Sequence, residues 1–173
     1  MNFPILSSLI LLPTIGALFL FFIKEKEGNN NTIKYVALFT TVVNFLISIY
    51  LWIVFDQSTS SFQFIEDRTW IKGFINYKVG VDGISILFII LTTFITPLCI
   101  ISVNNSVKNR LRDFLIAILI MESFMIGVFC ALDLVVFYLF FEAFEHRTST
   151  FMVFTFDTLF GFIVYSNCLL FIC

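Results

Sequence analysis

Among the acidic residues within or beside long apolar stretches of the sequence, three are candidates for proton chemistry: Glu122, Asp133 and Glu142. An ionisable side chain at the centre of a lipid bilayer costs about 2.5–3.5 kcal/mol on insertion scales, so it marks a functional site by default. Desolvation favours the neutral form of a carboxyl group, and a nearby cation favours its charged form. A carboxyl group held between these influences can bind and release a proton. We therefore predict proton chemistry at Glu142 first, and also at Glu122 and Asp133.

The spacing of these acids predicts where they lie in a membrane. Glu122 precedes Asp133 by 11 residues, and Glu142 follows it by 9. At 1.5 Å per helical residue, the two glutamates lie about 16 and 14 Å from a turn at Asp133. Two carboxyl groups at equal depth on adjacent antiparallel helices could exchange a proton or share a cation. These two spans contain no basic residue, so a cation for Glu142 must come from elsewhere.

Each acid also has a structural interpretation. Glu142 could be a neutral acid hydrogen-bonded to a neighbouring helix, and a polar contact between helices would explain Glu122 equally well. Asp133 stands where a helix begins, a position that favours an N-cap. Asp82 precedes Gly83 in "VDGIS", where capping is again expected.

The elements that must position these acids are apolar helices long enough to cross a bilayer, which takes about 20 residues. The first segment lacks a basic start and an A-x-A site, so we interpret it as a retained span and not a signal peptide. A fifth segment opens at Leu134 and is interrupted by Glu142 and then by polar residues 145–147. The prediction is an all-α, polytopic transmembrane protein with five to six spans. The apolar stretches are 3–23, 33–55, 84–103, 114–132, 134 onward, and 151–173, the last containing Asp157.

Composition excludes several classes of function. The chain is 60% hydrophobic and 13% charged, against about 45–50% and 25% in soluble domains, so its surroundings are a lipid bilayer. A net charge of −2 gives no support for a nucleic-acid partner. The four cysteines form no C-x-x-C pair, and His146 is the single histidine. We expect no metal, haem or iron–sulfur ligation, and we interpret the cysteines as small apolar residues.

Basic residues predict the orientation. Seven Lys and Arg residues fall on the side of the 24–34 and 104–113 loops, against three in the 56–80 loop. Because short loops rich in Lys and Arg stay inside, the first two loops face the cytoplasm or matrix, and the N-terminus and the 56–80 loop face outward. This last loop is the one sizeable polar stretch, and its pattern is compatible with a hairpin or a lateral helix.

Three segments closely resemble subunit 4 of proton-pumping NADH–quinone (ubiquinone) oxidoreductase, respiratory complex I, in the antiporter-like family. They are "LWIVFDQSTSSFQFIEDRTWI" (51–71), "YKVGVDGISILFIILTTFITPLCII" (77–101) and "MESFMIGVFCALDLVVFYLFFEA" (121–143). The resemblance covers roughly residues 1–143 and ends there. It implies two parts: 1–143 as N-terminal membrane helices of this subunit, and 144–173 as a divergent apolar segment. Because the family's subunit has about fourteen helices, we expect a truncated form.

The resemblance also implies residue roles. Glu142 occupies the position of the family's essential fifth-helix glutamate, which pairs with a lysine on the seventh helix. Asp133 matches a position that is often acidic, whereas Glu122 matches no universal family position. Since this sequence contains none of the family's central lysines, we expect that the isolated chain does not pump protons.

The resemblance implies that the chain works with other membrane-arm subunits. NADH, FMN, iron–sulfur clusters and ubiquinone would be bound by partner subunits, and this chain would bind no cofactor. The implied location is the mitochondrial inner membrane, as a multi-pass protein, or alternatively a bacterial cytoplasmic membrane. Two other functions remain open: a subunit of a multisubunit cation/proton antiporter, and a non-catalytic fragment or a piece of a split subunit.

Overall fold

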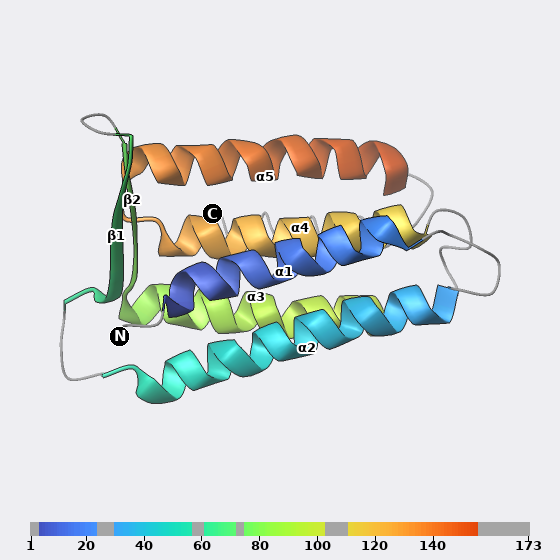
Figure 1. The fold of residues 1–173 in the computed structure, drawn as a ribbon, viewed down its shortest axis with the longest axis horizontal. Helices are drawn as coiled ribbons and strands as arrows, with labels where there is room; N and C mark the ends of the chain where they lie inside the picture. Colours follow the sequence, from blue (N-terminus) through green and yellow to red (C-terminus); the bar gives the residue numbers. More distant parts are fainter. Residues whose placement is uncertain (1–3, 24–29, 57–60, 72–74, 103–110, 156–173) are drawn as a thin grey trace.

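The computed structural model describes residues 4–23, 30–56, 61–71, 75–102 and 111–155. This part of the chain forms five α-helices and a two-stranded antiparallel sheet. The helices run along the long axis of the molecule, and the sheet stands across one end of them (Figure 1). The helices are α1 (Ile5–Phe22), α2 (Asn30–Val54), α3 (Gly83–Ser102), α4 (Leu111–Cys130) and α5 (Leu134–Thr155).

Within the described residues, helices α1 to α4 are long and apolar enough to cross a membrane. They contain 18 to 25 residues each, which matches the length of about 20 that a bilayer requires. Helix α5 is equally long, with 22 residues, but carries Glu142 and Glu145 in its sequence. The predicted all-α, polytopic fold is therefore confirmed.

Helix α5 is longer than the sequence pattern indicated. Glu142 and the polar residues 145–147 were expected to interrupt it, yet the helix continues to Thr155. Neither Gly nor Pro occurs in α5, and these are the residues that most disfavour a helix interior. The expected sixth stretch, 151–173, thus begins inside α5. Residues 156–173, with Asp157, lie outside the described residues.

Helices α1 to α4 form a ring, with α5 on its outside. Helices α1 and α3 each pack against both α2 and α4, whereas α5 packs mainly on α4. Apolar side chains fill the ring in two clusters, one toward each end. Representative buried members are Leu6, Leu9, Ile86 and Ile126 in the first cluster, and Leu20, Ala37, Ile100 and Leu115 in the second.

Two glycines allow neighbouring helices to approach closely. A β-carbon at Gly16 in α1 would lie 2.8 Å from the side chain of Thr40 in α2. A β-carbon at Gly127 in α4 would lie 2.7 Å from the ring of Phe140 in α5. Small residues at helix contacts are typical of membrane bundles, where close packing replaces the hydrophobic effect as the force between helices.

The outer surface of the helices is strongly apolar. Large side chains such as Phe22 and Leu134 are 80% and 82% exposed, and similar residues occur on α1, α2, α3 and α5. A water-soluble monomer rarely exposes a continuous apolar surface of this kind. Lipid is the solvent that suits it, so the chain is a multi-pass membrane protein.

The polar 56–80 loop contains the sheet. Strand β1 (Gln63–Ile71) pairs with β2 (Ile75–Val81) in antiparallel register, which confirms the hairpin among the two predicted alternatives. The register shifts between Gln63 and Glu66. Phe64 lies in this irregularity with a φ of 53°, a left-handed conformation typical of bulges.

The hairpin is attached to two helix ends. The Glu66 carboxylate accepts a hydrogen bond from the backbone N–H of Leu6 (2.9 Å) and another from the Ser7 hydroxyl. A carboxylate suits this place because the first N–H groups of α1 have no partner in the helix and carry partial positive charge. The Lys78 carbonyl accepts from the N–H of Leu132, at 3.0 Å. The hairpin therefore joins the start of α1 to the α4–α5 turn.

Asp82 caps α3, as its position before Gly83 predicted. Its Oδ1 accepts a hydrogen bond from the backbone N–H of Ser85 at 2.7 Å. This bond stabilises the ionised carboxylate and lowers the pKa of Asp82 from its ordinary value.

The helix ends alternate as the predicted topology requires. Opposite the hairpin, the Lys34 ammonium donates to the carbonyl of Ile101 (3.5 Å), and the Arg112 guanidinium donates to that of Ile23 (3.3 Å). These contacts bring the start of α2, the end of α3, the start of α4 and the end of α1 to one end of the bundle. Which end faces the cytoplasm or matrix stays a prediction.

Candidate functional site: two glutamates on opposite sides of α4 and α5

Glu122 lies inside the ring of four helices and is 3% exposed. Its Oε1 accepts a hydrogen bond from the Asn44 side-chain amide of α2 at 2.8 Å. Asn44 is itself fully buried. A hydrogen bond between polar side chains of two membrane helices is worth about 0.6 kcal/mol on average, and up to about 1.7. The structure thus supports a helix-to-helix contact at Glu122, one of the two interpretations left open.

Glu122 belongs to a set of buried polar side chains in the ring. Ser48 of α2 and Thr93 of α3 lie 2.8 Å apart between their hydroxyl oxygens. Ser123 of α4 donates to the carbonyl of Ile10 in α1, at 2.7 Å. The buried polar residues of the described chain are Thr41, Asn44, Ser48, Thr93, Thr96, Glu122 and Ser123. All four helices of the ring therefore meet through polar contacts as well as apolar ones.

Two atoms of the Asn44–Glu122 pair lack a hydrogen bond. Among the described residues, Glu122 Oε2 and Asn44 Oδ1 are buried and have no partner. Buried polar groups nearly always have a partner, and leaving one unpaired costs about 1–3 kcal/mol. This pair is therefore the least satisfied place in the described interior of the ring.

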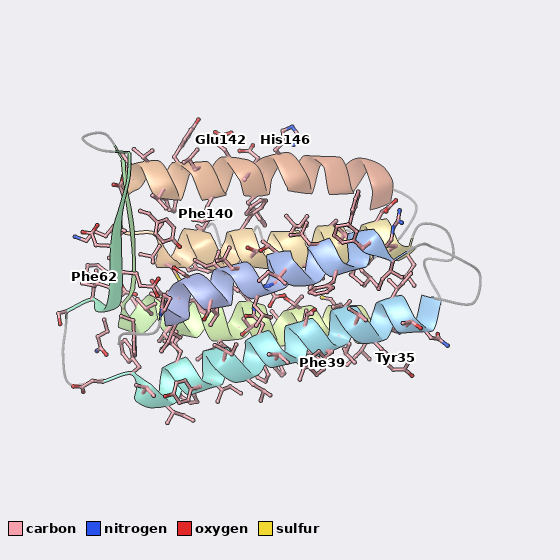
Figure 2. The ribbon with its side chains drawn as sticks, in the orientation of Figure 1. Tyr35, Phe39, Phe62, Phe140, Glu142 and His146 are labelled. Carbon is pink, nitrogen blue, oxygen red and sulfur yellow. The ribbon has the colours of Figure 1, made fainter. Side chains whose placement is uncertain are left out.

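Glu142 lies on the opposite side of α5 from α4. Figure 2 shows Glu142 and His146 pointing away from the other helices, whereas Phe140 points toward α4. The Glu142 side chain is exposed. One turn earlier, the Tyr138 hydroxyl donates a hydrogen bond to the Glu142 carboxylate. Around them the exposed surface of α5 is apolar, with Leu134, Val135, Phe137 and Leu139.

The two glutamates are not brought together. Helices α4 and α5 are adjacent and antiparallel, as predicted, but Glu122 faces into the ring and Glu142 faces outward. The reason is rotation about the helix axis: Phe140 faces α4, and a residue two positions later is turned by about 200°. Direct proton exchange between the two carboxyl groups, as the sequence spacing suggested, does not fit this arrangement.

Asp133 acts as a helix cap. Its Oδ1 accepts a hydrogen bond from the N–H of Val135 at 2.9 Å, and its carbonyl accepts from Phe137 at 2.9 Å. The residue stands at the hairpin end of α5, far from the middle of the bundle. This is the capping interpretation offered for it, and a role in proton transfer stays a prediction.

Sequence reasoning missed Asn44 and Glu66. A signal existed for Asn44, because one amide in the uncharged run 35–55 is costly in lipid, and Ser48 follows on the same helix face. No local signal marks Glu66, whose partners precede it by about sixty residues. Cys99 and Cys130 are free thiols, and the described residues hold no cluster of three or more His, Cys, Asp and Glu that could bind a metal.

The fold defines a multi-pass helical membrane protein. One acid, Glu122, is enclosed in the bundle, and another, Glu142, is turned outward. The family described as NADH-ubiquinone oxidoreductase chain 4, amino terminus, matches residues 8–128. The chain belongs to this family, which confirms the resemblance seen in the sequence.

Individual relatives agree with the family. The chain is 45% identical over 139 residues to NADH-ubiquinone oxidoreductase chain 4 of Marchantia polymorpha, covering 80% of this chain and 28% of that protein. It is 50% identical over 141 residues to NADH-quinone oxidoreductase subunit M of Rhodobacter capsulatus, covering 80% and 27%. The chain therefore spans less than a third of the length of the curated relatives it matches.

A solved structure shares the fold. A chain of the membrane-bound sulfane sulfur reductase, an archaeal respiratory membrane complex, superposes with a TM-score of 0.65 at 18% sequence identity. The match covers 86% of this chain and 22% of that one. At this identity the likeness concerns the fold alone.

Proposed function

We propose that this chain supplies the N-terminal helices of a proton-translocating membrane-arm subunit of a NADH–quinone oxidoreductase. Family membership and the names of the relatives support the proposal. In this assembly NADH, FMN, iron–sulfur clusters and ubiquinone are bound by partner subunits. The relatives come from plants, fungi and bacteria, so the membrane is the mitochondrial inner membrane or a bacterial cytoplasmic membrane.

The observation that carries the proposal is the outward position of Glu142. It lies 8 residues into α5, about 12 Å along the helix axis, on a surface otherwise suited to lipid. A carboxylate facing lipid at that depth is expensive. We infer that a partner helix covers this face of α5 and brings a cationic or hydrogen-bonding group to Glu142.

The chemistry follows from that partner. A cation close to Glu142 holds the carboxylate ionised, and withdrawal of the cation lets the carboxylate bind a proton. Tyr138 keeps the carboxylate oriented by donating its hydroxyl hydrogen. Movement of the partner relative to α5 would thus load and unload Glu142, which is how an intramembrane acid takes part in a proton relay.

The test replaces Glu142 in the assembled complex. Glu142→Gln keeps the size and removes the titratable proton, and Glu145→Gln makes the same change one turn later on the exposed side of α5. We expect E142Q to lose most proton translocation per NADH oxidised, and E145Q to retain it. Unchanged translocation in E142Q contradicts the proposal. Co-purification with cation/proton antiporter subunits, without quinone-reducing subunits, points instead to the antiporter alternative.

A further inference from the structure

The enclosed pair Asn44–Glu122 is separate from the proposed site at Glu142 and is not used by it. One hydrogen bond already joins the pair, from Asn44 Nδ2 to Glu122 Oε1 at 2.8 Å. The second oxygen of each side chain is buried and unpaired among the described residues. Both unpaired atoms are acceptors when Glu122 is ionised, so they cannot bond to each other in that state.

The cost of burying a charge also disfavours the ionised form of Glu122. An ionised carboxylate at Glu122 would be a buried charge, which is tolerated only when it is paired. Titratable side chains also occur on the elements that pack against α4. Among the described residues they are Lys34, Tyr35 and Tyr50 on α2, Cys99 on α3, Tyr77 and Lys78 on β2, and Tyr138, Glu142, Glu145 and His146 on α5.

None of these groups supplies the missing positive charge. Lys34 precedes Asn44 by ten residues, about 15 Å along α2, and contacts the carbonyl of Ile101 at the bundle end. Strand β2 meets α4 near Cys130, eight residues or about 12 Å from Glu122. On α4 itself, Arg112 pairs with Asp113. The four ionisable residues of α5 named above, Tyr138, Glu142, Glu145 and His146, are exposed.

We propose that Asn44 and Glu122 form a proton-binding site, in which one bound proton closes a hydrogen-bonded ring between a carboxylic acid and an amide across α2 and α4. The proton sits on Glu122 Oε2, and the resulting O–H donates to Asn44 Oδ1. The existing Asn44 Nδ2 to Glu122 Oε1 bond forms the other side of the ring. A single proton thus removes the charge and satisfies both unpaired atoms at once.

The hydrogen-bonded ring between Asn44 and Glu122 makes the contact between α2 and α4 depend on a proton. With the proton bound, two hydrogen bonds join the helices. With it lost, one bond and an unpaired buried charge remain. Proton binding at this site therefore holds the ring of four helices closed. This role differs from that of Glu142, which faces outward and needs a partner from another part of the assembly.

Infrared difference spectroscopy of the full chain in lipid nanodiscs tests the site. The carbonyl stretch of a protonated carboxylic acid is separate from the bands of carboxylates. We expect this band at neutral pH in the unmodified chain, its loss in Glu122→Gln, and its retention in Glu145→Gln as the matched control. In Asn44→Leu the band is expected to move to higher frequency, because the amide no longer donates to the carbonyl.

Folding supplies an independent readout. Gln at position 122 can form the same ring with Asn44 through its own amide, so E122Q should give the folded yield of the unmodified chain. Asn44→Leu alone should lower that yield, and adding Glu122→Leu should restore it, since the lone acid is then removed. The proposal is overturned by a carboxylate at Glu122 at neutral pH, by a band that N44L leaves unmoved, or by E122Q failing to fold.

Discussion

The interior of the α1–α4 ring and the outer face of α5 each place a glutamate within an apolar helix, yet they treat it differently. In the ring, Glu122 has a hydrogen-bonding partner from another helix of the same chain and almost no exposure. On α5, Glu142 has a neighbour from its own helix, Tyr138, and is exposed. The first acid has its hydrogen-bonding partner on another helix of the same chain, whereas the second presents its carboxylate to the outside of the described bundle.

This difference teaches that depth in a membrane does not define the role of an acid. Both glutamates lie at similar heights, and the insertion cost applies to both. What separates them is which side of the helix they occupy. An enclosed acid can bind a proton as part of the fold, and an outward acid can respond to a moving partner.

Reconstitution of the isolated chain in liposomes gives the largest expected contrast with the assembled complex. Glu142 then faces lipid and Glu122 is closed off in the ring, so we expect no proton flux above that of empty liposomes. A fluorescent pH indicator inside the liposomes measures it, with an added ionophore as the positive control. Robust flux through the isolated chain would remove the distinction between the two regions.

A larger side chain at Gly127 would disrupt the packing of α5 against α4. Gly127→Val places side-chain atoms where the Phe140 ring lies, since even a β-carbon would be 2.7 Å from it. Overpacking of this kind costs about 1–3 kcal/mol. We expect that loss of stability in denaturant titration in mild detergent. Gly83→Ala is the control, because nothing lies within 4 Å of its β-carbon position. Equal effects of the two would show that α5 is not packed on α4 as described.

The β1–β2 hairpin joins the start of α1, in the four-helix ring, to the turn that precedes α5. Glu66→Gln removes the charge that faces the start of α1, and a charge in such a place is worth about 1 kcal/mol. We expect faster proteolysis within the hairpin and a lower melting temperature. The neighbouring Asp67 is exposed, so Asp67→Asn should change neither. A larger effect of D67N would contradict the attachment.

The smallest expected effect concerns pH and the cap of α3. The pKa of Asp82 is lowered in the fold by the hydrogen bond from Ser85. Its contribution to stability is therefore complete above the ordinary carboxyl pKa and is lost as the pH falls through the lowered one. Asp82→Asn keeps a capping oxygen without a titration. We expect thermal stability to fall in acid slightly less for D82N than for the unmodified chain, and a reversed order would contradict the cap.

Much of the fold follows from local sequence. The uncharged runs predict helices α1 to α4 because lipid demands about 20 apolar residues for each crossing. Asp82 before Gly83 predicts its cap because that interaction spans three residues. For the 56–80 loop the sequence left two alternatives, a hairpin and a lateral helix. An alternating residue pattern forms a strand only if a partner strand pairs with it.

The site was less predictable because it depends on rotation and on distant partners. Counting residues from Asp133 gives the heights of Glu122 and Glu142 but not the direction in which either points. Packing decides that direction, through contacts such as that of Gly127 with Phe140. Asn44 meets Glu122 across 78 residues of sequence, and no local pattern connects them.

Photo-cross-linking on α5 tests most directly whether its outward face meets a protein partner. A benzophenone amino acid replaces Tyr138, which is 59% exposed beside Glu142, or Phe140, which lies against Gly127 of the same chain. After irradiation in the native membrane, we expect adducts with another polypeptide from position 138 and adducts within the chain from position 140. Lipid adducts alone from position 138 would contradict it.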